Sequence, residues 1–215
     1  MQVFVLGLVL AALPEGLIAE LDKAWATRTT SNYMSVAQTT VRKLKPHAKE
    51  FEAAWRMARA LCWMSERKPD FQDGAYKARI GKQAMGHALR AIKLQPKRVE
   101  GHYYYGWAVG QWSLGISIAK ALWKGAEGKL RKSMTKSQRI DRSYDYFGVL
   151  RMWGRFFHSL PWPKYDGPKA LKYLKEANRL TPRNLRGYFY LVESLIKEDK
   201  NSKACAVAGK GLAVK

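Results

Sequence analysis

Acidic residues are scarce in this chain of 215 residues, and cysteines are scarcer still. Asp and Glu total 17 against 39 Lys and Arg, which gives a formal net charge of +22. A charge of this size and sign predicts attraction to a polyanion, whether nucleic acid, an anionic lipid surface or an acidic protein surface. Charge alone does not distinguish the three.

The lack of cysteine pairs and of catalytic signatures excludes several classes of protein. Cys62 and Cys205 have no CxxC spacing and no metal-like spacing to the histidines, so we expect neither a disulfide framework nor a metal site. The sequence contains no HExxH, GxSxG, GxGxxG or GxxxxGK[ST] motif. We therefore predict a binding protein with no catalytic residues and no cofactor.

Long hydrophobic runs are missing too, apart from one at the N-terminus. Val3 to Leu13 is an uninterrupted apolar run, too short to span a bilayer but within the range of a signal peptide. No Lys or Arg precedes it, so the usual positive region is absent. Residues 1–13 are thus either a signal peptide or an apolar N-terminal segment. The first predicts export to the periplasm or the cell exterior, and the second a cytoplasmic protein.

Strand signals are nearly absent, whereas helical signals recur along the chain. Apolar residues repeat every three or four positions in seven segments that Pro or Gly clusters separate, which predicts an all-α fold. The segments are Leu17–Trp25, Phe51–Met64, Ala75–Leu94, Leu130–Ile140, Phe147–Leu160, Ala170–Leu180 and Tyr188–Ile196.

Internal repetition narrows the fold further. Val41–Pro46, Ala91–Pro96 and Ala177–Pro182 read alike, and each proline marks the end of a helix because proline cannot continue one. Ser137–Arg142 is a degenerate fourth copy. After the second copy, His102–Gly106 places an aromatic residue and a glycine as the tetratricopeptide pattern W-x-x-L-G does.

These repeats predict a tetratricopeptide-like α-solenoid of antiparallel helix pairs, with four to five pairs in a single domain over residues 14–215. The charge-free stretch 101–119 is then the first helix of the central repeat, surrounded by neighbours. Most of it is expected in the core, and Tyr103 and Trp107 are the residues whose exposure decides whether an apolar ligand reaches it.

Short motifs in a fixed order resemble the regulator of microtubule dynamics family, whose domains are tetratricopeptide-like. Trp55–Ala60 resembles the family's WRLARA, and Gly154–Phe157 resembles its GRWCY, within a resemblance that covers roughly residues 50–200. The chain is more distantly similar to the T component of TRAP transporters, although the lipobox cysteine is missing. The intervening and following motifs are Ala91–Pro96, Gly101–Tyr105, Gly115–Ile116 and Pro161–Trp162.

The sequence departs from this family at two places. Tyr104 stands where the family has Trp, and Pro163–Gly167 leads directly to the next helix without a longer basic connection. The resemblance implies no catalytic residues. It implies protein interaction, microtubule association or the binding of a phospholipid in the concave groove.

Aromatic and basic residues are the candidates to bind a ligand or partner. Arg59 lies one helical turn after Trp55, where its guanidinium could hold a carboxylate or phosphate. Alternatively, Trp55 is core and Arg56 and Arg59 pair with acids of a neighbouring helix. A second aromatic group, from Trp153 to Tyr165, is either core or the wall of a tunnel. The candidates are Trp55, Arg59, Tyr103, Trp107, Lys120, Lys124, Trp153 and Arg155.

Residues 116–142 carry eight Lys and Arg against Glu127 and Asp141. Four of the basic residues fall on one helix stripe, which is either a solvated face or a docking surface for an anionic membrane or acidic protein. The aromatic residues stand mostly in charge-free stretches and no nucleic-acid module is present, so we do not expect a nucleic-acid partner. The stripe is Lys129, Lys132, Lys136 and Arg139.

Two hypotheses of function follow. The first is a scaffold or adaptor whose concave surface takes a peptide or helix of a partner protein. The second is a carrier for a lipid or other amphipathic ligand, with aromatic walls around the tail. In that case Arg59, Lys120 or Lys124 would lie near its anionic head.

Overall fold

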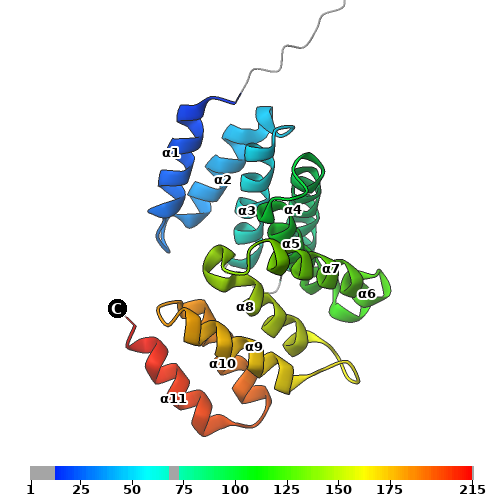
Figure 1. The fold of residues 1–215 in the computed structure, drawn as a ribbon, viewed down its shortest axis with the longest axis vertical. Helices are drawn as coiled ribbons and strands as arrows, with labels where there is room; N and C mark the ends of the chain where they lie inside the picture. The colour runs from blue at the N-terminus through cyan, green and yellow to red at the C-terminus, as the bar shows by residue number, and fades with distance from the viewer. Residues whose placement is uncertain (1–12, 68–72, 215) are drawn as a thin grey trace, which may run out of the picture.

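The computed structural model describes residues 13–67 and 73–214, and every regular element in these ranges is helical (Figure 1). Apart from Leu13, the N-terminal apolar run lies outside the described residues. None of the described helices is long and apolar enough to cross a membrane. The elements are α1 (Glu15–Ala26), α2 (Tyr33–Leu44), η1 (Lys45–His47), α3 (Phe51–Arg67), α4 (Gly74–Leu94), α5 (Val99–Ile116), α6 (Ile118–Trp123), α7 (Ala126–Ile140), α8 (Tyr144–Ser159), α9 (Gly167–Leu180), α10 (Leu185–Lys197) and α11 (Asn201–Leu212).

The helices pack as five successive antiparallel pairs: α1 with α2, α3 with α4, α5 with α7, α8 with α9, and α10 with α11. The short helix α6 is an insertion inside the third pair. Figure 1 shows the pairs following one another in a curved array, from α1 and α2 at one end to α11 at the other. The prediction of an all-α, tetratricopeptide-like solenoid is therefore confirmed.

The repeated sequence motif marks one structural position. Helices α2, α4 and α9 end at Leu44, Leu94 and Leu180, each two residues before a proline, and α7 ends at Ile140 in the degenerate copy. All four are the second helices of their pairs. The next pair begins after each motif, which is why the motif recurs once per repeat.

Helix starts are fixed by side-chain caps where a short polar residue precedes the helix. The Asp73 carboxylate accepts from the backbone N–H of Tyr76 at 2.8 Å, and the Asp166 carboxylate accepts from that of Lys169 at 2.9 Å. Such caps satisfy donors that have no partner inside the helix. They set the starts of α4 and α9.

Helix α5 occupies the middle of the core, as the stretch 101–119 predicts. It ends earlier than that stretch, because Ser117 adopts a φ of 76° and breaks the helix before α6. Its closest neighbour is α4. A Cβ on Gly115 would lie 2.3 Å from the backbone nitrogen of Ala78, so the two helices touch where only glycine fits.

Candidate binding groove

The first helices of the five pairs form the inner layer of the curve, and their side chains contact one another across it. Asp22 of α1 pairs with Arg56 of α3, and Tyr103 of α5 donates to Asp145 of α8 at 2.5 Å. Helices α8 and α10 are joined by Arg155 and Glu193 at 2.5 Å. This inner layer is the concave groove in which a tetratricopeptide-like array binds its ligands.

Arginines and tryptophans alternate along one side of the groove. Each guanidinium carbon lies 4.2–5.0 Å from the centroids of the two rings that flank it. Such cation–π contacts are worth about 0.5–2 kcal/mol each, the larger values where water is excluded. We name this row the arginine–tryptophan ladder. In order it is Trp55, Arg59, Trp25, Arg28, Trp63, Arg186 and Trp107.

Arg59 has its carboxylate partner within the chain. Its Nη2 lies 3.1 Å from Oδ1 of Asp22, and Arg56 binds the other oxygen of the same carboxylate at 2.5 Å. Burial opposes ionisation of Asp22, but the two arginines outweigh it and lower the pKa of this carboxyl. Of the two interpretations of Trp55 and Arg59, the structure therefore agrees with the one in which Trp55 is a core residue. Trp55 is buried, and Arg56 and Arg59 bridge to an acid of a neighbouring helix.

A polar cluster joins α3 to α10 across the mouth of the groove. The Tyr190 hydroxyl donates to Oε1 of Glu66 at 2.6 Å, and Arg186 Nη2 lies 3.3 Å from Oε2. Burial and the Glu66 carboxylate raise the pKa of Tyr190. We call these three residues the α3–α10 clasp, because they connect the second repeat directly to the fifth.

Sequence reasoning missed most of these residues, although one signal points to some of them. Carboxylates are rare in this chain, so an acid such as Glu66 or Glu193 on an inner helix indicates a paired cation. The missed residues are Asp22, Trp25, Arg28, Trp63, Glu66, Arg186 and Tyr190.

A cavity of about 230 Å³ opens between α5, the α6–α7 segment, α8 and α10. Its wall is mostly apolar. Gln111 is one of its lining residues, and the buried Oε1 of this side chain has no hydrogen-bond partner, although such a group is normally paired. Arg155 stands at the wall, with its side chain 29% exposed. The apolar part of the wall includes Leu114, Leu122, Leu130, Phe156 and Leu160.

Tyr103 and Trp107, the two residues chosen from the stretch 101–119, both lie at this cavity. They are only 3% and 9% exposed, because α3, α8 and each other's rings cover them. Both residues belong to the core. Most of the surface that a ligand in the cavity could contact therefore comes from helices other than α5. Arg155 also lies at the cavity, where it stacks on Tyr190 with 4.6 Å between the guanidinium carbon and the ring centroid.

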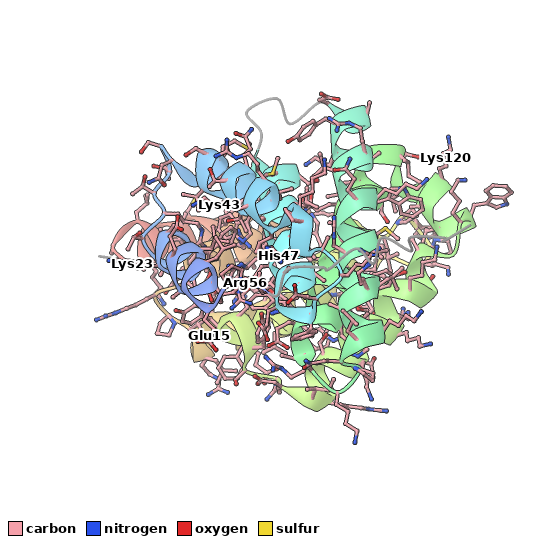
Figure 2. The ribbon with its side chains drawn as sticks, turned by 90° about the horizontal axis from the view of Figure 1, so that it is seen from above. Glu15, Lys23, Lys43, His47, Arg56 and Lys120 are labelled. Atoms are coloured by element: carbon pink, nitrogen blue, oxygen red, sulfur yellow. The ribbon has the colours of Figure 1, made fainter. Side chains whose placement is uncertain are left out.

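The other sequence candidates do not join this site. Trp153 is buried and stacks on Phe157 and Tyr173, within the packing of α8 against α9. Lys120 on α6 and Lys124 directly after it are exposed, and Figure 2 shows Lys120 at the outer edge, well away from Arg56 on α3. Lys120 and Arg59 therefore cannot serve the same anionic head, and of the three alternatives none lines the cavity.

Trp162 was expected within an aromatic group near Trp153, and this too is wrong. It is 89% exposed in the loop after α8. The basic stripe is placed as predicted: its four side chains are exposed along α7, while Met134 and Ser137 on the same helix are buried.

Five antiparallel helix pairs around a concave groove define a tetratricopeptide-like helical array. The groove presents a cavity and a row of arginines, and no cluster of potential metal ligands occurs among the described residues. Comparison with known proteins identifies the family. The sequence matches regulator of microtubule dynamics protein 1-3 over residues 17–215, and the chain belongs to this family.

Among solved structures, the chain is similar to the crystal structure of MamA protein. The identity is 12%, the TM-score is 0.47, and the match covers 92% of this chain and 89% of that one. No curated protein matches the sequence significantly.

Proposed function

We propose that this protein is a non-enzymatic binding module that holds a segment of a partner protein in its concave groove. An apolar side chain of that segment would occupy the cavity between α5, α7 and α8. Family membership supports a protein partner, and the family's description makes a microtubule the first one to test. The observation that carries the proposal is the apolar cavity that opens into the groove of a tetratricopeptide-like array.

The polar groups around the cavity favour a peptide. The Oε1 of Gln111 is a buried acceptor without a partner, so it calls for a ligand that donates a hydrogen bond. A peptide N–H provides such a donor, whereas an acyl chain does not. Most charges of the inner layer are already paired with each other, so apolar contact and this hydrogen bond would supply much of the recognition.

A second candidate function is a carrier for a lipid or other amphipathic anionic ligand. It is favoured by the depth of the apolar wall, to which five helices contribute, and by Arg155 beside it. An acyl tail would lie among Leu122, Leu130 and Phe156, with the anionic head at Arg155. The two functions predict different contents for the same cavity.

Two glycine variants test whether the cavity binds anything. Gly110 lines the cavity and Gly86 stands on the outer helix α4, and a Cβ at either position would meet nothing within 4 Å. Gly110→Phe should therefore fill the cavity without disturbing the fold, and Gly86→Phe is its matched control. Co-sedimentation with microtubules should fall at least tenfold for G110F and stay unchanged for G86F.

Native mass spectrometry of the same proteins separates the carrier from the scaffold. A bound mass of several hundred daltons that G110F loses and G86F retains would establish the carrier. An empty wild-type protein whose microtubule binding depends on Gly110 would establish the scaffold. If G110F matches G86F in both measurements, the cavity is not a binding site and both functions are refuted.

A further inference from the structure

Two tryptophans stand out because they are almost fully exposed. Trp123, the last residue of α6, is 85% exposed, and Trp162, in the loop between α8 and α9, is 89% exposed. Tryptophan is highly buried on average, and Trp25, Trp55 and Trp107 each have less than a tenth of their surface exposed. Exposure of two such rings marks a surface with a role outside the core.

Both tryptophans belong to one edge of the molecule. Lys164, two residues after Trp162, pairs with Glu127 at 2.5 Å, and Glu127 lies in the first turn of α7, just after α6. The same carboxylate pairs with Arg131 at 3.0 Å. Figure 1 shows α6 and the loop between α8 and α9 projecting on the same side of the array. The Lys164–Glu127 pair joins the loop to α7, and Arg131 holds the Glu127 carboxylate from within the same helix.

Lysines surround this edge without acidic partners. An open hollow beside α6 has Trp112, Met85 and Ile116 among its lining residues. In the described part of the chain, no carboxylate pairs with the lysines of this hollow or with the basic stripe of α7. The carboxylate of Glu127 lies at this edge, where Lys164 and Arg131 lower its pKa and outweigh the opposing effect of burial. The lysines of the hollow are Lys82, Lys120, Lys124 and Lys129.

Exposed tryptophans beside unpaired lysines fit the interface of an anionic membrane. The amphipathic indole ring favours the headgroup level of a bilayer, and the positive charge of a lysine is attracted to anionic lipids. A nucleic acid would instead require aromatic rings along a basic groove, whereas these two rings project from the end of α6 and from the loop between α8 and α9. An acidic protein partner would explain the unpaired lysines but not the exposure of the two tryptophan rings.

We propose that this edge docks onto an anionic phospholipid bilayer. Trp123 and Trp162 insert into the interfacial layer, and Lys120, Lys124 and Lys129 lie against the headgroups. This surface adjoins the cavity, because α6 and Glu127 also contribute to the cavity wall, but its two tryptophans and three lysines do not line the cavity, so the proposal goes beyond the binding function argued above. Docking would leave the groove open to its own ligand.

Vesicle flotation with the full chain tests the proposal. Vesicles of phosphatidylcholine with 30% phosphatidylserine should carry the protein, and pure phosphatidylcholine vesicles should not. Lys120→Gln/Lys124→Gln should weaken binding roughly 25-fold, since each lysine near an anionic surface contributes about fivefold. The matched control is Lys172→Gln/Lys175→Gln, which removes two exposed lysines from α9 and should leave binding unchanged.

The tryptophans need a separate readout. Trp123→Ser/Trp162→Ser should reduce vesicle binding roughly tenfold or more, because both rings lose their apolar contact with lipid. Trp123→Phe/Trp162→Phe keeps an aromatic ring at both positions and should therefore retain part of the vesicle binding. Brominated phosphatidylcholine mixed with phosphatidylserine should quench wild-type tryptophan fluorescence, and the Phe variant should lose most of this quenching because its other tryptophans are more buried.

Three results would overturn the proposal. The first is no binding to the anionic vesicles. The second is binding that the tryptophan and lysine variants leave unchanged. The third is tighter binding, dependent on both tryptophans, to a single-stranded oligonucleotide or to polyglutamate than to vesicles. Gly110 lines the cavity, whereas the tryptophans and lysines of the docking edge do not, so vesicle binding that persists in G110F shows that the two surfaces act independently.

Discussion

Replacing Arg186 with alanine should destabilise the protein by about 3 kcal/mol. Its guanidinium carbon lies 4.5 Å from the ring centroid of Trp63 and 5.0 Å from that of Trp107, two contacts worth about 1 kcal/mol each when partly shielded from water. Its side chain and that of Glu66 are each only 18% exposed. Loss of the cation also removes one charge partner of Glu66, which keeps the Tyr190 hydroxyl and the nearby charge of Lys77, so this pair adds about 1 kcal/mol.

Urea unfolding followed by circular dichroism measures this loss, with the slope m as the check that unfolding stays two-state. Arg186→Met keeps an apolar stem between the two rings and should lose less than the alanine variant. A double-mutant cycle with Glu66→Gln should give a coupling of about 1–2 kcal/mol. The control is Arg142→Ala, whose pair with Glu176 is 45% and 30% exposed and should contribute at most about 1 kcal/mol. An R186A loss no larger than that of R142A would refute the clasp.

Two further predictions concern pH and helix packing. Burial, Arg155 and Lys197 lower the pKa of His158 to about 4, below the value of about 6.5 in an unfolded chain. The folded state therefore binds fewer protons, and stability is complete above pH 6.5 and lost as the pH falls toward 4. Wild type should lose up to about 2 kcal/mol more than His158→Gln between pH 7 and pH 5, and equal urea midpoints for the two at both pH values would contradict this. Gly115→Ala should cost about 2 kcal/mol or more in thermal unfolding because its Cβ would strike the backbone of α4, whereas Gly86→Ala, in open space, should gain about 0.5–1 kcal/mol.

The sequence determines most of the helix pairing by local rules. Proline can only follow a helix end, so Pro46, Pro96 and Pro182 reveal the period of the array before any contact is known. Helix α11 has no comparable signal. Its sequence is rich in Ala and Gly, and it buries only small residues such as Ala204 and Gly211, so its apolar stripe is hard to detect.

The groove is less predictable because its contacts join residues that are distant in sequence. Arg59 lies in the inner layer, but its partner Asp22 lies 37 positions away in the sequence, so the pair is not visible from local spacing. Nothing near Trp162 in the sequence shows that its ring is bare while Trp153 is packed, since only the path of the following loop decides this. The sequence identifies which side chains are able to bind a ligand or partner, whereas the curvature of the array decides which of these side chains lie close together.

The α3–α10 clasp also bears on how the chain folds. In an ordinary solenoid each repeat touches only its neighbours, so repeats can unfold from either end in sequence. Here Glu66 and Tyr190 are bonded across 124 residues, and Arg186 lies between rings of the second and third repeats. Loss of α10 would uncover Trp63 and Trp107 in the centre of the array. The last repeat is therefore tied to the middle of the array, and folding has to close, at some stage, a loop that spans more than half of the chain.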